Sequence, residues 1–148
     1  MDNVHSFRLT PKDGAARLQQ VHEATFTLVH DDKGRQRLLI WVKTTRPGET
    51  TDDRGVEDWD SPAIVCLLTD PLELPAGSGN SVELPNAIAT EKWGERFLYY
   101  WDHSDFVTAR MTVRNANDRY EISFDGHCEA GNRVTFEAAI PAGSAGGT

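Results

Sequence analysis

Cysteine is scarce in this sequence, because Cys66 and Cys128 are the only two among 148 residues. They do not form a Cys-x-x-Cys pair, so the familiar redox and zinc motifs built on that spacing are absent. Both lie among apolar residues and are interpreted as small, buried core residues with free thiols. A chain of this length buries enough surface to be stable without a disulfide or a metal.

Long apolar runs are also missing. No stretch approaches the roughly 18 apolar residues that a membrane-spanning helix needs. The first ten residues, MDNVHSFRLT, lack the basic start and apolar run of an export signal. We therefore expect a cytoplasmic protein without a membrane partner.

Positive charge is in short supply, with 15 Lys and Arg against 23 Asp and Glu and a net charge of −8. Such a chain repels a phosphate backbone at long range, and its arginines are spread along the sequence. We expect no nucleic-acid partner.

Several familiar catalytic and nucleotide-binding motifs are absent. The sequence has no Gly-x-Gly-x-x-Gly, no phosphate-loop lysine motif, no Gly-x-Ser-x-Gly and no His-Glu-x-x-His. These absences predict no cofactor and argue against nucleotide-dependent catalysis.

The C-terminal third alternates between apolar and polar residues over 106–114, 119–129 and 133–140. A period of two is typical of strands with one buried face. Turn residues over 115–118 and 130–132 separate the runs, which predicts an antiparallel meander. Facing apolar residues set the expected register: Arg114 lies opposite Arg119, and Glu129 opposite Arg133.

The rest of the chain suggests further strands over 24–29, 37–44, 63–68 and 96–101, with a short one near 81–84. Leu39 and Trp41 make the second side of run 37–44 apolar, so this strand is either central or covered there. Residues 10–22 fit either a short helix or a turn that feeds a strand, and we favour the strand.

Together these runs predict an all-β, mostly antiparallel fold. A β-sandwich is favoured over a small barrel, with at most one short N-terminal helix. We expect a single domain over 1–140 and a disordered tail over 141–148. Two long loops, 44–62 and 70–95, are candidates for function because loops of this length are uncommon in compact domains.

The first candidate site is the segment Trp101–Asp105, which we expect in a loop. His103 and Asp102 could act in catalysis, and Asp102, His103 and Asp105 could bind a divalent cation. The alternative is an ordinary turn in which Asp and Ser cap main-chain amides.

The second candidate follows from the expected register, which places Asp125 opposite Glu137 with His127 and Arg110 as neighbours. Two crowded carboxylates can raise one pKa, as general acid–base chemistry requires. The alternative is a solvated polar face with ordinary ion pairs.

Two further features suit binding. The loop 44–62 is acidic, and Trp59 could pin it to the domain. Phe97, Tyr99 and Trp101 share one side of a strand, with Trp41 expected nearby, so they belong to the core, an interface or a ligand pocket.

The sequence therefore favours a non-enzymatic module that presents its two long loops to a protein or a small ligand, with homodimerisation possible. The alternative is a small hydrolase or isomerase that uses Asp125, His127 and Glu137, or His103 with Asp102.

Overall fold

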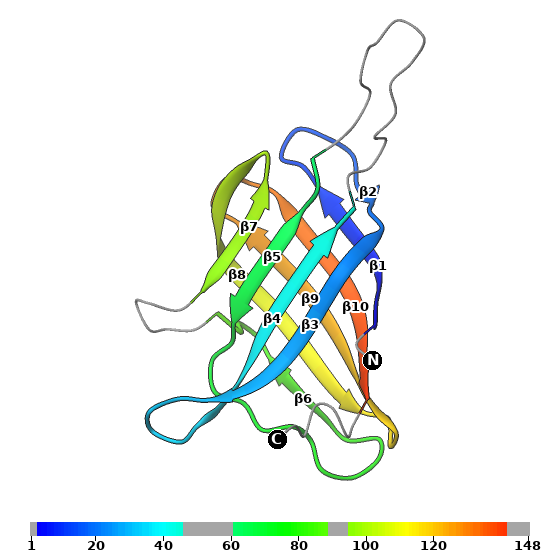
Figure 1. The fold of residues 1–148 in the computed structure, drawn as a ribbon, viewed down its shortest axis with the longest axis vertical. Coiled ribbons are helices and arrows are strands. Elements are labelled where there is room, and N and C mark those ends of the chain that lie inside the picture. The colour runs from blue at the N-terminus through cyan, green and yellow to red at the C-terminus, as the bar shows by residue number, and fades with distance from the viewer. Residues whose placement is uncertain (1–2, 46–60, 89–94, 142–148) are drawn as a thin grey trace, which may run out of the picture.

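A computed structural model describes residues 3–45, 61–88 and 95–141, and every element in these ranges is a β-strand (Figure 1). The strands are β1 (Asn3–Thr10), β2 (Arg17–Leu18), β3 (Val21–His30), β4 (Gln36–Thr44), β5 (Ile64–Leu68), β6 (Ser81–Leu84), β7 (Arg96–Tyr100), β8 (Asp102–Asn115), β9 (Arg119–Cys128) and β10 (Arg133–Pro141). The expectation of an all-β, antiparallel fold is confirmed, and none of the described residues forms the short N-terminal helix that we allowed. The described ranges likewise contain no helix that could cross a membrane.

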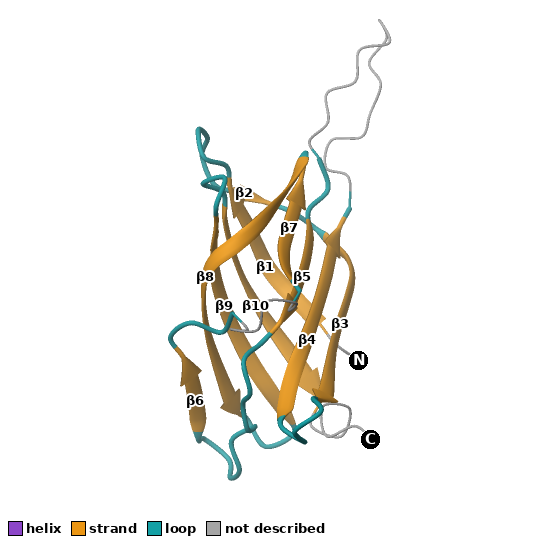
Figure 2. Ribbon diagram, turned by 90° about the vertical axis from the view of Figure 1, so that its left-hand side faces the viewer, coloured by secondary structure: helices purple, strands orange, loops and turns teal. Residues whose placement is uncertain are grey.

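The strands form one curled sheet in the order β2-β1-β10-β9-β8-β7-β5-β4-β3, and β6 pairs with β8 off this path. Curling brings β3, at one end of the sheet, close to β1, near the other end (Figures 1 and 2). The structure thus shows a half-barrel whose two ends approach one another. It does not confirm the preference for a sandwich over a barrel.

Strand β8 joins the two halves of this sheet. Its first residues, Asp102–Asp105, pair with β7, whereas its last residues, Met111–Arg114, pair with β6. On its other side β9 follows it through most of its length. The change of partner lets β3, β4, β5 and β7 turn away and face the half made by β1, β10, β9 and β8 (Figure 2).

The core lies between these halves and is built by the inward side chains of both. Phe136 stacks between Phe7 and Phe124, with ring centroids 5.9 Å and 4.8 Å away. Across the core it also meets Phe26 of β3 at 6.3 Å. Because Phe136 contacts rings from both halves, the two halves share a single apolar interior.

Strand β1 was missed by the sequence analysis, and its geometry shows why. Its register against β10 shifts between His5 and Arg8, and Ser6 has a φ of 56°. Phe7 and Leu9 are buried two residues apart, but Val4 is buried three residues before Phe7. A β-bulge therefore interrupts the period of two by which strands are recognised.

A second β-bulge changes which residues of β8 face the core. The register against β9 shifts between Phe106 and Thr108, so Phe106 is buried and Val107 is 54% exposed. An unbroken alternation over 106–114 predicts that Val107 faces inward with Ala109. The prediction was wrong because an unbroken alternation cannot contain the extra residue of a bulge.

Between the end of β1 at Thr10 and the start of β3 at Val21, the chain forms a turn and the very short strand β2. The N–H of Gly14 donates to the carbonyl of Pro11 at 3.2 Å, and β2 then pairs with β1 for two residues. Of the two alternatives, a turn that feeds a strand was therefore better than a short helix, although β2 is much shorter than expected. At the other end, Pro141 belongs to β10 and not to a tail, and residues 142–148 lie outside the described ranges.

Candidate interaction face

The most distinctive surface is the outer side of β4, β5 and β7. Seven uncharged side chains, nearly all of them apolar, alternate outward from these strands and are partly exposed. They are Leu39, Trp41, Ile64, Cys66, Leu68, Phe97 and Tyr99. We call this set the apolar face; it looks toward the viewer in Figure 1.

Local sequence explains why this face is apolar. Strand β5 is Ile-Val-Cys-Leu-Leu, which leaves no polar side chain for either side. Strand β4 buries Leu38, Ile40 and Val42, so Leu39 and Trp41 must point outward. The expectation that this strand is central or covered is met by the first alternative, because β4 lies between β3 and β5. No described strand packs over the apolar face, because β4, β5 and β7 contact chiefly their own sheet neighbours.

Strand register aligns the face into three rows across the sheet, which are numbered from the row that contains Lys43. The second, central row runs Thr25, Trp41, Cys66, Phe97 and Asp105 from β3 to β8. Its middle is uncharged and its ends are polar. The third row places Leu39 beside Leu68.

The first row borders the face with charge. It runs Glu23, Lys43, Ile64, Tyr99 and His103 from β3 to β8. Tyr99 is 41% exposed, which is unusual for a large aromatic ring in the middle of a sheet. The face therefore has an apolar centre and a rim that carries both signs of charge, the anatomy typical of a protein interface.

His103 and Asp105 form the rim on β8. The His103 Nε2 lies 3.2 Å from the Asp105 Oδ1, and the His103 ring packs 4.6 Å from Phe97. Segment 101–105 was expected in a loop, but residues 102–105 begin β8 and only Trp101 is a turn residue, with a φ of 62°. Alternation along β8 sends Asp102 to the opposite side from His103 and Asp105. In the described ranges, no three His, Cys, Asp or Glu side chains come together as a metal site would need.

Cys66 was expected in the core but lies half-buried at the centre of the apolar face. Burial, reinforced by the charge of Glu95, raises the pKa of its thiol. Cys128 is buried as expected, and burial together with the charge of Asp105 raises the pKa of its thiol to about 12. Both thiols are therefore protonated at neutral pH and are poor nucleophiles.

The outer side of β8, β9 and β10 is polar, and its register differs from the expected one by two residues. Arg114 lies opposite Glu121, and Arg133 lies opposite His127. The facing apolar pairs survive a shift of two, so the hydrophobic pattern alone could not exclude it. As a consequence Asp125 lies opposite Thr135, and the predicted Asp125–Glu137 pair does not form.

Asp125 is instead held by arginine. The Arg133 Nε and Nη2 donate to its two carboxylate oxygens at 2.9 Å and 2.8 Å, and the His127 Nε2 lies 3.5 Å away. These hydrogen bonds from Arg133 outweigh burial and lower the pKa of Asp125. Arg110, directly opposite Asp125, pairs with Glu83 of β6 at 2.6 Å. The cluster lowers the pKa of Asp125 and keeps its carboxylate ionised. A general acid would instead need a raised pKa.

Two open hollows lie outside the apolar face, and the linings of both mix polar and apolar surface. One, of about 500 Å³, lies on the outer side of β8, β9 and β10 beside Arg114, Glu121 and Glu137. The other, of about 430 Å³, lies beside His103, Asp105 and Glu129. Neither includes Trp41 or Tyr99, which were expected to bind a ligand or a partner.

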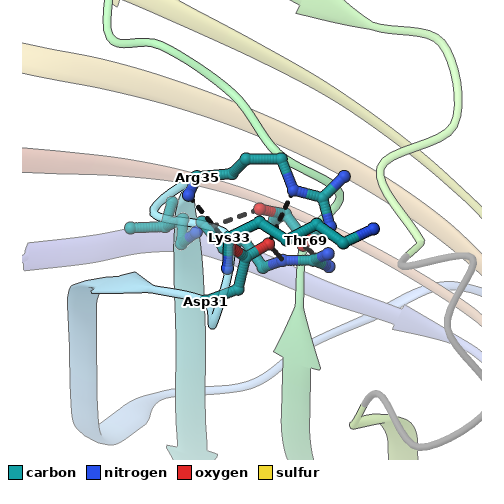
Figure 3. Close-up of polar contacts among 6 residues, drawn as sticks. Asp31, Lys33, Arg35 and Thr69 are labelled. Atoms are coloured by element: carbon teal, nitrogen blue, oxygen red, sulfur yellow. Dashed lines mark hydrogen bonds and ion pairs between the residues drawn. The ribbon is translucent and has the colours of Figure 1, made fainter.

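Polar contacts around Asp31 hold the turn between β3 and β4 (Figure 3). Arg37 is 3% exposed; its Nε donates to the Asp31 Oδ2 at 3.2 Å and its Nη1 to the Thr69 carbonyl at 3.3 Å. Asp31 also accepts the main-chain N–H groups of Lys33 and Arg35, each at 2.9 Å. Burial would raise the pKa of Asp31, but these hydrogen bonds together lower it to about 2.

The remaining predicted residues are placed as follows. Trp59 and the acidic residues of loop 44–62 fall mostly in 46–60, outside the described ranges. Trp41 and Tyr99 belong to the apolar face, and Trp101, 52% exposed, follows β7 directly. The sequence analysis missed the outward residues Ile64 and Leu68, although the unbroken apolar run of β5 was a usable signal.

Comparison with protein-family models, with curated proteins and with solved structures found no match to this chain. The geometry of the apolar face must therefore carry any functional conclusion.

Proposed function

We propose that this chain is a non-enzymatic interaction module that binds a protein through the apolar face. One observation carries the proposal: seven neighbouring uncharged, largely apolar side chains point outward from three adjacent strands of the described chain. Scattered exposed apolar residues need no explanation, but a contiguous patch rimmed by polar groups is typical of an interaction site.

The other half of the sheet provides an internal reference. Its outward positions on β8 and β9 are mainly Thr, Arg, Ser, Asp, Glu and His, as a water-exposed sheet requires, and the bulged Val107 is the apolar exception. Exposed apolar surface forgoes about 25 cal/mol per Å² relative to burial. Covering the apolar face is therefore favourable. Covering the outer side of β8, β9 and β10, which we call the polar half, would require each ion pair to be desolvated.

A protein fits this surface better than a small ligand. Small molecules bind in concave pockets, whereas the outer side of a curled sheet is convex. A polypeptide can cover a convex patch of several strands.

The test is site-specific photo-cross-linking of the full-length chain in its native cell extract. A photoreactive phenylalanine analogue replaces Phe97 on the apolar face or, as the matched control, Ser123 on the polar half. We expect polypeptide adducts of defined mass from position 97 and none from position 123. Absence of adducts at both positions, or equal labelling at both, would overturn the proposal.

A further inference from the structure

We propose that the protein seated on the apolar face is a second copy of this chain, related by a two-fold axis parallel to β5. This inference rests on the proposed function and names the partner. In such a dimer β5 faces β5 of the second copy, and β4 faces its β7. Each contact then occurs twice, as in any isologous interface.

The sizes of the side chains suit this arrangement. Two convex sheets come closest at the axis and diverge on either side. Cys66, the smallest residue of the apolar face, lies on the axis in the second row, and the large rings of Trp41 and Phe97 flank it. Trp41 would pack against Phe97 of the second copy, where the larger gap requires large side chains.

The charges also suit it. In the first row the axis passes through Ile64, so Lys43 faces Tyr99 of the second copy and Glu23 faces His103 of the second copy. An ammonium group over an aromatic ring is attractive, and so is a carboxylate beside an imidazole. In the second row Asp105 faces Thr25 of the second copy. Like charges do not meet in either row.

A two-fold axis perpendicular to the strands through Cys66 is less favourable. It would map the second row onto itself, so that Asp105 faced Asp105 of the second copy. Like charges brought together across an interface are costly. The axis parallel to β5 is therefore the one we propose.

The area of the apolar face sets the expected affinity of the dimer. Strands lie about 4.8 Å apart and rise about 3.3 Å per residue, so the rows span a flat footprint of roughly 400 Å². That is small beside the roughly 800 Å² per partner of a standard interface, and it indicates a weak, reversible dimer. Because each copy carries a net charge of −8, added salt should screen the repulsion and favour association.

The first experiment is sedimentation velocity of the full-length chain over a concentration series into the high micromolar range. We expect the mass to rise from 16.5 kDa toward twice that value. Ile64→Lys would set two ammonium groups face to face at the axis and weaken the dimer by about tenfold or more. Ser123→Lys makes the same charge change on the polar half and should leave the dimer unchanged. Circular dichroism melting verifies that both variants fold.

Cysteine cross-linking tests the direction of the axis. In a Cys66→Ser background, in which the remaining Cys128 is buried, we expect disulfide dimers from Ile64→Cys and Leu68→Cys, whose positions meet their own copies on the proposed axis. Trp41→Cys should not cross-link to itself, whereas it would do so about the perpendicular axis. Efficient self-cross-linking at position 41 but not at 64 or 68 would overturn the proposed arrangement.

The two proposals can fail separately. A wild-type chain that stays monomeric at every concentration rejects the second copy. If position 97 then still gives photo-adducts to a different polypeptide, the interaction module stands. If neither dimer nor adduct is found, both proposals are rejected.

Discussion

The two halves of the curled sheet present opposite chemistry to their surroundings while sharing one core. On β8, β9 and β10 the outward residues are mainly charged or hydroxylic, and they pair with one another, as Arg133 does with Asp125. On β4, β5 and β7 the outward residues are chiefly Leu, Ile, Trp and Phe. Inward residues are apolar in both halves.

The inward residues of both halves are those that folding constrains, whereas the outward residues are those in which a function can be sought. Both halves must satisfy the same core, so their inward sides are constrained alike. Nothing in folding requires an apolar outer side, and water penalises it. The outer side of β4, β5 and β7 is therefore the surface to which the proposed interaction is assigned.

The largest expected loss of stability comes from a substitution in the core that the two halves share. Phe136→Ala removes a ring that contacts both halves and should lower the free energy of unfolding by about 3–5 kcal/mol. Chemical denaturation followed by tryptophan fluorescence and by circular dichroism should show one coincident transition. Two separate transitions would mean that the halves do not share a core.

A smaller loss is expected from Gly126→Val on the inward side of β9. A Cβ at Gly126 would lie 2.6 Å from the Phe106 Cε1 and 2.9 Å from the Phe124 Cε1, so both rings must move. We expect a loss of about 1–3 kcal/mol. Ser123→Val, on the outward side of the same strand, is the matched control and should change stability by no more than about 0.5 kcal/mol. Equal losses would contradict the assignment of inner and outer sides.

Acid should weaken the contact between Asp31 and the buried Arg37. The lowered pKa of Asp31 stabilises the fold above the ordinary carboxyl value, and this contribution is lost as the pH falls toward about 2. Asp31→Asn should therefore lower the melting temperature at neutral pH, and the difference from the wild type should shrink steadily below about pH 4. A difference that stays constant down to the acid limit would show that the charge of Asp31 is not the cause.

The smallest effect is expected on the polar half. Arg133 and Asp125 are 48% and 35% exposed, so water screens their pairing. Asp125→Asn should cost about 0.2–1 kcal/mol at neutral pH, less in high salt and less as acid protonates the wild-type carboxylate. Urea denaturation at two salt concentrations measures it. A loss as large as that of Phe136→Ala would mean that Asp125 has a role beyond this ion pair.

Sequence alone determined the fold class and much of the strand layout. The alternation over 106–114, 119–129 and 133–140 located three strands and their turns, and the short strand over 81–84 was also found. Two apolar sides on the strand over 37–44 pointed to the apolar face. These features depend on local periodicity and turn chemistry, which a single sequence displays directly.

Only the tertiary structure decided which residues meet. A register shifted by two keeps every apolar residue on its own side, so pattern alone could not separate Asp125 from Glu137. The bulges at Ser6 and Val107 hid one strand and turned a valine outward. The partnership of β4, β5 and β7, which gathers distant residues into one apolar face, depends on long-range pairing that no local pattern encodes. Local forces selected the strands, whereas packing around a common core selected their neighbours.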